Sequence, residues 1–213
     1  MIDPAGADDA GAYLVRLLRL DPAAPVRLRP AGEGRVALWA RLPFDALVTR
    51  TVRASLAEDV TVRAADLLAS LRGGPAPSRA DALWRWPLPP STGRMVERLP
   101  AGELHRVGAA AASALREAVA SGVRGKAVGE RVVRDALLAH VPIVVTADDG
   151  TRVEVAQRLV QALARMGFLG AAGTDHAVEV RVAGAWVGLV APYGSAWHRS
   201  TGGLGLRPAA SSP

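Results

Sequence analysis

The stretch VPIVVTADDGTRVEVAQRLVQALARMG, residues 141–167, decides the fold of this chain. It opens with a β-branched run that is too short for a typical helix, and Asp148-Asp149-Gly150 supplies turn residues after that run. From Val155 to Met166 apolar residues recur at helical spacing, and Gly167 is suited to end a helix. The stretch therefore predicts a buried strand, a turn and an amphipathic helix in succession.

Residues 151–155 are compatible with two structures. Thr151 and Glu154 match a capping box, in which each side chain accepts a hydrogen bond from an amide that has no partner at a helix start. This interpretation, which we expect, begins the helix near Arg152. Alternatively, residues 152–155 pair with residues 142–146 across the Asp-Asp-Gly turn as a β-hairpin, because both segments alternate acceptably.

The neighbouring segments extend the prediction over the C-terminal part of the chain. Apolar spacing predicts helices over 103–121 and 127–140, and alternation around Ala183-Gly184 predicts a hairpin over 178–190. Residues 102–197 are thus expected to form an α+β domain with the order helix, helix, strand, helix, strand, strand. Residues 198–213, rich in small residues, are expected to be a flexible tail.

The N-terminal part predicts a second α+β domain over residues 1–72, with mainly antiparallel strands. A helix is expected over 8–20, strands over 26–29, 35–42, 47–53 and 60–62, and a short helix over 64–71. Residues 73–101, rich in Pro, Gly and Trp, are expected to link the two domains. Trp84 and Trp86 are expected to hold this linker against one of the domains, because large aromatic side chains are rarely left in water.

Composition makes the protein basic without concentrating its charge. The formal charge is +6, the pI is about 11, and Lys126 is the one lysine among 26 cations. An arginine excess of this kind is also typical of GC-rich genomes. Residues 1–100 carry 14 cations and 11 acids, and residues 101–213 carry 12 and 9, so each part is +3. An excess spread in this way is weaker evidence for a nucleic-acid partner than a basic block.

Several classes of protein are disfavoured by the sequence. The absence of cysteine excludes disulfides and thiolate chemistry. Neither a basic, apolar leader nor an apolar run of membrane-spanning length is present, so we expect a cytoplasmic protein without a membrane partner. No catalytic residue, metal site or cofactor is predicted. The histidines lack ligand spacing, Gly125-Lys126 lacks the flanking residues of a P-loop, Ser195 sits in an incomplete nucleophile motif, and Asp148-Asp149 serve a turn.

Four arginines are the candidate binding residues. Arg152, Arg158 and Arg165 are expected on the exposed side of the helix, with Arg181 on the following strand, where they could contact the phosphates of DNA or RNA. Tyr193 and Trp197 could stack on bases. The plain alternatives are a solvated helix face for the arginines, and a core or subunit interface for the aromatic residues.

The sequence therefore favours a non-catalytic binding protein that contacts nucleic acid through its C-terminal helix and hairpin. The alternative is a protein-interaction or homo-oligomeric subunit whose contacts are Trp39, Trp84, Trp86 and the aromatic C-terminal motif. An enzyme without a recognisable motif is the least favoured interpretation.

Overall fold

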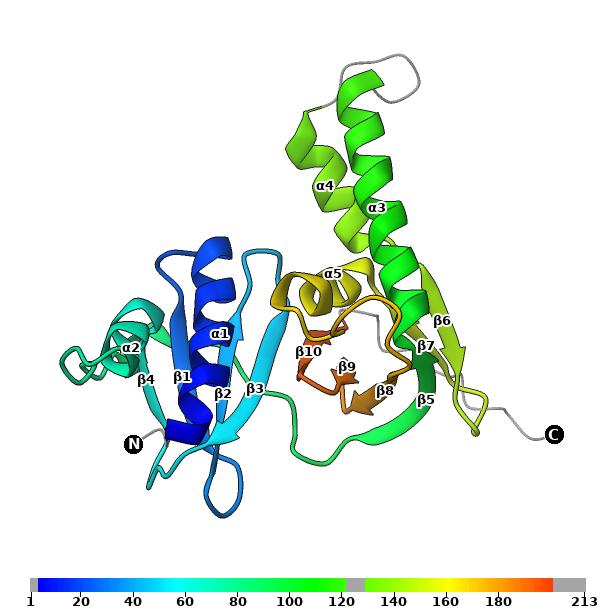
Figure 1. The fold of residues 1–213 in the computed structure, drawn as a ribbon. Helices are drawn as coiled ribbons and strands as arrows, with labels where there is room; N and C mark the ends of the chain where they lie inside the picture. The colour runs from blue at the N-terminus through cyan, green and yellow to red at the C-terminus, as the bar shows by residue number, and fades with distance from the viewer. Residues whose placement is uncertain (1–3, 122–128, 201–213) are drawn as a thin grey trace.

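The computed structural model describes residues 4–121 and 129–200 and has an α+β fold, as predicted (Figure 1). Its N-terminal part consists of α1 (Pro4–Leu20), β1 (Pro25–Pro30), β2 (Arg35–Arg41), β3 (Leu47–Arg53), β4 (Val60–Arg63) and α2 (Ala64–Leu71). These elements agree with the helix, four strands and short helix that the periodicity predicted.

The C-terminal part keeps the predicted order of helices and strands and adds three strands to it. It consists of β5 (Arg94–Pro100), α3 (Ala101–Ser121), α4 (Glu130–Ala139), β6 (Ile143–Thr146), β7 (Arg152–Val155), α5 (Gln157–Met166), β8 (Ala177–Ala183), β9 (Trp186–Ala191) and β10 (Gly194–Arg199). The added strands are β5, in the stretch expected to be a linker, β7, and β10, whose last two residues were expected to belong to the flexible tail. Most of the expected tail, residues 201–213, lies outside the described residues.

The helix start near Arg152 is wrong, and the alternative hairpin is correct. β6 and β7 pair in antiparallel fashion with Thr146 opposite Arg152, and α5 begins at Gln157 without a side-chain cap at Ala156. Val153 and Val155 are buried, whereas Arg152 and Glu154 are exposed. This burial has the period of two that a strand requires, and it outweighs the local capping signal.

One antiparallel sheet runs through both parts of the chain. Its strand order is β4-β1-β2-β3-β10-β9-β8-β5, so the two parts meet where β3 pairs with β10. The register there places Thr49 opposite Ser195 and Leu47 opposite Trp197. The main core lies between this sheet and the helices, and its largest fully buried side chains include Tyr13, Leu38 and Phe168.

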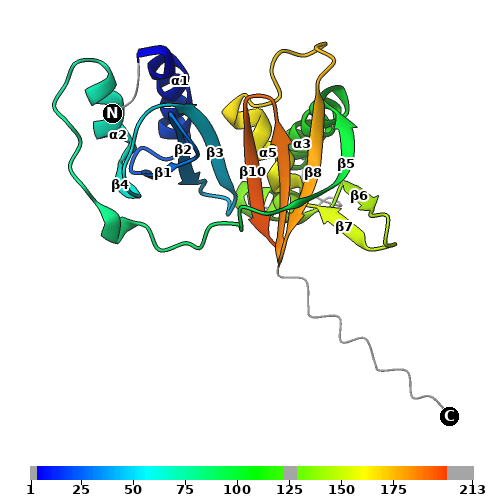
Figure 2. The same cartoon turned by 90° about the horizontal axis from the view of Figure 1, so that it is seen from below.

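The opposite face of the sheet carries a second hydrophobic cluster. Figure 2 shows α1, α3 and α5 on one side of the sheet and the segment that connects the two parts on the other. Trp84 and Leu88 of that segment pack against Leu47 and Trp197. Trp84 donates a 2.7 Å hydrogen bond from Nε1 to the carbonyl of Trp86. Trp86 lies beside β2, with the guanidinium carbon of Arg41 5.2 Å from its ring centroid. The two tryptophans thus hold the segment against the sheet, as predicted, but against both parts of the chain rather than one domain.

Beyond this body, α3 and α4 form a helical arm. Figure 1 shows the C-terminal end of α3 and the neighbouring α4 projecting away from the sheet. Among the described residues, no helix is long and apolar enough to cross a membrane.

Candidate functional site

A groove of about 910 Å³ lies on the helix-covered side of the molecule. Its walls come from α3, α4, α5 and the β2–β3 loop at residues 43–45, so it lies where the helical arm meets the body. Apolar side chains form much of its surface, and they include Phe44, Leu115, Leu137 and Leu138.

Five arginines line this groove, which we call the arginine groove. They are Arg116 on α3, Arg131 and Arg134 on α4, and Arg158 and Arg165 on α5, and the lining contains two carboxylates, Asp45 and Asp135. The formal charge of the lining is thus five minus two, or +3. The formal charge of the whole chain is +6. The charge of this one groove therefore equals half of the net charge of the chain.

The arginines differ in how their charges are compensated. Arg134 pairs with Glu130, and Arg131 approaches Asp135 at 3.9 Å. Arg116 and Arg165 form no ion pair within the described part of the chain, and both side chains are exposed. Exposed pairs one helical turn apart hold their partners weakly. Arg116 and Arg165 are therefore the cations most available to an incoming anion.

Asp45 fixes one end of the groove. It is a non-glycine residue in the left-handed region, with φ of 62°, and its carboxylate lies 2.7 Å from Arg41 Nη2 and 3.6 Å from Arg158 Nη1. Its carbonyl accepts a 2.9 Å hydrogen bond from Nδ1 of His198. Burial lowers the pKa of His198, and the nearby Arg158 adds to that effect, so the positive charge at this end comes from arginine.

The structure brings two of the four predicted arginines together and separates the other two. Arg158 and Arg165 line the groove, whereas Arg152 lies on β7, outside the groove lining. Arg181 is opposite Gly188, which is opposite Trp197, so Arg181 belongs to the sheet face away from the helices. Residues directly opposite in an antiparallel pair share a face. The expectation of one surface with all four arginines is therefore wrong.

The two aromatic candidates also lie in different surroundings. Tyr193 is 42% exposed and has its ring edge-on to His176. Trp197 is 8% exposed, lies over Gly188, and donates a 2.9 Å hydrogen bond from Nε1 to Ser195 Oγ. Trp197 belongs to the second hydrophobic cluster and presents no free ring face for a base. Tyr193 remains accessible.

Three members of the site, Arg116, Arg131 and Arg134, were not predicted from the sequence. All three lie on segments that were predicted as helices, and the i, i+3 spacing of Arg131 and Arg134 placed them on one helix face. Their approach to Arg158 and Arg165 depends on how α3 and α4 pack on α5, which no local sequence pattern indicates.

Two other polar residues that were weighed as catalytic candidates, Asp149 and Ser195, form hydrogen bonds with neighbouring residues of the chain. Asp149 accepts a 2.9 Å hydrogen bond from the amide of Thr151, and hydrogen bonds from Thr151 hold the pKa of Asp149 below its usual range. Ser195 Oγ is the acceptor for Trp197. Lys126 lies outside the described residues. Within the described part, no three His, Asp or Glu side chains form a group that could hold a metal ion.

Comparison with solved structures shows a shared fold. The chain superposes on a DNA polymerase sliding clamp from Pseudomonas aeruginosa with a TM-score of 0.55 and 12% identity, covering 93% of this chain and 63% of the clamp. The DnaN sliding clamp from Bartonella birtlesii bound to griselimycin gives a TM-score of 0.56 and 15% identity, covering 93% of this chain and 64% of the clamp. The clamp from Caulobacter crescentus gives a TM-score of 0.53 and 11% identity, covering 93% of this chain and 65% of the clamp. The chain thus spans less than two thirds of these clamp chains.

Family comparison divides the sequence near the end of the Trp-containing segment. A search of curated proteins found no match. Residues 1–88 match the model described as Domain of unknown function (DUF8010). Residues 88–203, more than half of the chain, match a second model, and the chain therefore belongs to the family described as Domain of unknown function (DUF8185).

Proposed function

We propose that this chain is a non-catalytic, cytoplasmic binding protein that contacts DNA through the arginine groove. The observation that carries the proposal is the concentration of five arginines against two carboxylates in one open groove. The guanidinium group presents several donors in a plane that matches phosphate oxygens, which suits arginine to a nucleic-acid backbone. Arg158 and Arg165 keep the role that the sequence assigned to them, and Arg116, Arg131 and Arg134 join them.

The placement of these arginines supports contact with an extended polyanion. They lie on three helices that surround the groove, so successive phosphates along a strand could reach different side chains. Arg158 is 18% exposed and is held by Asp45 and by the carbonyl of Phe44 at 3.4 Å. This arginine therefore positions the groove wall, while Arg116 and Arg165 supply the exposed, uncompensated charges.

The shared fold favours DNA over other polyanions. The structures that this chain resembles are DNA polymerase sliding clamps and beta subunits of DNA polymerase III. These proteins share a fold with this chain. The positive charge of the arginine groove is a separate argument for binding DNA. The proposed contact is with the phosphate backbone, so it carries little sequence preference.

Fluorescence anisotropy with labelled duplex DNA, repeated over a salt series, tests this proposal. We expect the logarithm of the binding constant to fall linearly with the logarithm of salt, by about 0.9 for each phosphate contacted. Single-stranded RNA serves as the competing ligand in a parallel titration. An absence of DNA binding at low salt, or a clear preference for RNA, would contradict the proposal.

A second candidate function, homo-oligomer formation, is favoured by the edges of the sheet. The β4 edge is covered, because Asp81 Oδ1 accepts from the amide of Thr61 at 2.7 Å and the carbonyl of Thr61 accepts from Ala80 at 2.7 Å. The outer edge of β5 pairs with no strand among the described residues. Unpaired strand edges invite pairing with another chain. This edge replaces Trp39, Trp84 and Trp86 as the expected contact, since those rings pack within the chain.

Replacing Arg98 with proline should convert an oligomer to a monomer without unfolding the chain. The amide of Arg98 bonds to the carboxylate of Glu97 at 2.9 Å and so belongs to the outer edge of β5. Proline removes that donor, and sheets tolerate proline on the outer side of an edge strand. Light scattering measures the mass, and Arg98→Ala, which keeps the amide, is the control. An unchanged mass for both variants relative to the unaltered protein would exclude this edge.

A further inference from the structure

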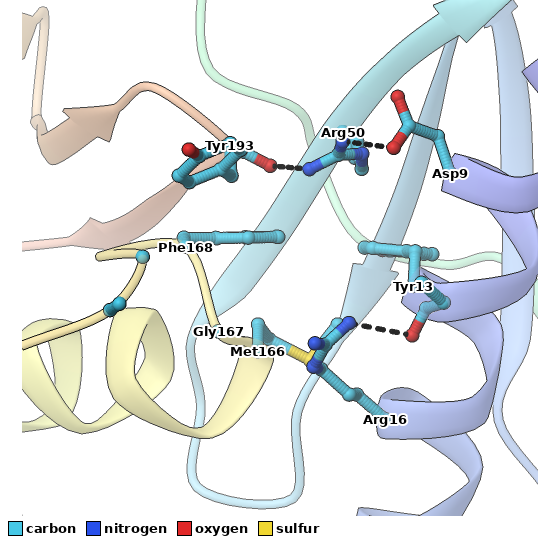
Figure 3. A pocket seen from close by; sticks show the side chains of 11 residues that line it. Asp9, Tyr13, Arg16, Arg50, Met166, Gly167, Phe168 and Tyr193 are labelled. Atoms are coloured by element: carbon cyan, nitrogen blue, oxygen red, sulfur yellow. Dashed lines mark hydrogen bonds and ion pairs between the residues drawn. The ribbon is translucent and has the colours of Figure 1, made fainter.

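A second cavity, of about 420 Å³, lies between the two parts of the chain (Figure 3). One wall is formed by α1 and β3, and the other by the loop after α5 together with the turn between β9 and β10. We call it the junction cavity. It shares no lining residue with the arginine groove, so a role for it is independent of the proposed function.

Three aromatic side chains line the junction cavity, two of them buried in the core and one exposed. Tyr13 and Phe168 have nearly parallel rings, with an interplanar angle of 7° and centroids 6.3 Å apart. Tyr193 contributes a third, exposed ring from the β9–β10 turn. Tyr13 donates a 3.2 Å hydrogen bond to the carbonyl of Val48, and burial raises the pKa of its phenol. Its side chain therefore stays uncharged and adds no negative charge to the cavity.

The charged side chains of the junction cavity leave one cation uncompensated. Arg50 is occupied, because its Nη2 lies 2.5 Å from Asp9 Oδ1 and its Nη1 donates to the carbonyl of Tyr193 at 2.5 Å. Arg16 bonds to the carbonyl of Ala12 at 3.2 Å and pairs with no carboxylate in the described segments. With Asp9 as the one acid of the lining, the formal charge is two minus one, or +1.

Two glycines allow these side chains to lie directly on the loop after α5. A Cβ atom built on Gly167 would lie 2.9 Å from Arg16 Nε, and one built on Gly170 would lie 2.9 Å from Tyr193 Cε2. Both glycines have positive φ, at 69° and 74°, which other residues adopt at a cost. The loop backbone thus brings a cation and an aromatic ring to the same cavity.

We propose that the junction cavity binds a small organic anion in which a planar aromatic group carries a carboxylate or a phosphate. The aromatic group packs against the exposed ring of Tyr193, and the acidic group accepts hydrogen bonds from Arg16. Sites for small molecules combine apolar walls with a few polar groups that fix the orientation of the ligand, and this cavity has both. Because its walls come from both parts of the chain, the bound anion bridges them.

Isothermal titration of the full chain with three probes tests this proposal. Adenosine monophosphate represents a nucleotide, 2-naphthoate represents an aromatic carboxylic acid, and inorganic phosphate supplies charge without a ring. We expect one or both aromatic probes to bind with a stoichiometry of one. Arg16→Gln should weaken that binding roughly tenfold, which is typical for the loss of a charge-assisted hydrogen bond.

Two further variants separate binding from folding and from general charge. Arg19→Gln removes an equally exposed cation from the same helix, outside the cavity lining, and should leave binding unchanged. Ala12→Trp places a large ring in the cavity from an exposed helix position and should abolish binding, while urea denaturation reports whether each variant is folded. Binding of adenosine monophosphate alone identifies a nucleotide site, and binding of 2-naphthoate alone identifies a carboxylic-acid site.

Three outcomes would overturn the proposal. They are no binding of either aromatic probe at millimolar concentration, equal affinity of Arg16→Gln and Arg19→Gln, and binding of inorganic phosphate as tight as that of the aromatic probes. Each can occur whether or not the arginine groove binds DNA, because the two sites share no residue.

Discussion

Replacing Arg116 and Arg165 together with alanine should lower the affinity for duplex DNA by about a hundredfold, because each charge-assisted hydrogen bond contributes about tenfold. The same change should make the salt dependence shallower by about 1.8, because each phosphate contact contributes about 0.9 to the slope. Both arginines are exposed and form no ion pair among the described residues, so their removal leaves no buried charge unpaired. Anisotropy titrations over a salt series measure both quantities.

The matched control for this prediction is the double variant Arg152→Ala and Arg181→Ala. It removes the same number of charges, but from β7 and from the sheet face away from the helices. Its affinity for DNA should stay within about threefold of that of the unaltered protein, because salt screens the long-range attraction between distant arginines and DNA. An equal loss in both double variants would assign the binding to net charge rather than to the arginine groove.

Replacing Gly194 with alanine should destabilise the chain by about 3 kcal/mol or more, through positive-φ strain and overpacking together. Gly194 has φ of 151°, and a Cβ atom there would lie 2.6 Å from the Phe168 ring and 2.7 Å from the carbonyl oxygen of Thr49. Phe168 is fully buried, and Thr49 lies on β3 opposite Ser195, so neither can retreat easily. Urea denaturation followed by circular dichroism measures the free energy of unfolding.

Gly184 separates the backbone cost from the steric cost. It also has positive φ, at 59°, but a Cβ atom built on it meets no atom within 4 Å. Gly184→Ala should therefore cost about 1 kcal/mol, the strain of a left-handed alanine alone. If the two variants lose the same free energy of unfolding, the close approach of Phe168 and Thr49 to Gly194 adds no steric cost to the substitution.

Local periodicity was sufficient to predict a helix or a strand wherever a segment had one clear pattern and a partner close in sequence. The N-terminal helix and four strands, the helix ending at Gly167 and the hairpin around Gly184 all follow from residues that lie within one turn or one loop of each other. The segment from Thr151 to Val155 carried two local signals of similar strength. Burial of Val153 and Val155 decided between them, and burial is a property of the assembled core.

By contrast, no local sequence pattern indicated that β5 is a strand. Its segment follows a run of prolines and tryptophans, and its side chains are mostly exposed, so composition suggested a linker. The strand forms because β8 offers an edge with which residues 94–100 can pair. Pairing of this kind depends on a strand almost eighty residues away, and no local pattern reports it.

The sequence by itself determined the α+β class, most of the helices and strands, and the high content of arginine. The tertiary structure alone decided which arginines share a surface. Arg116, Arg131 and Arg134 meet Arg158 and Arg165 because the arm of α3 and α4 folds against α5, while Arg181 is turned to the other sheet face by strand register. Charge acts through space, and the distances that matter between these side chains are fixed by the packing of elements that are far apart along the chain.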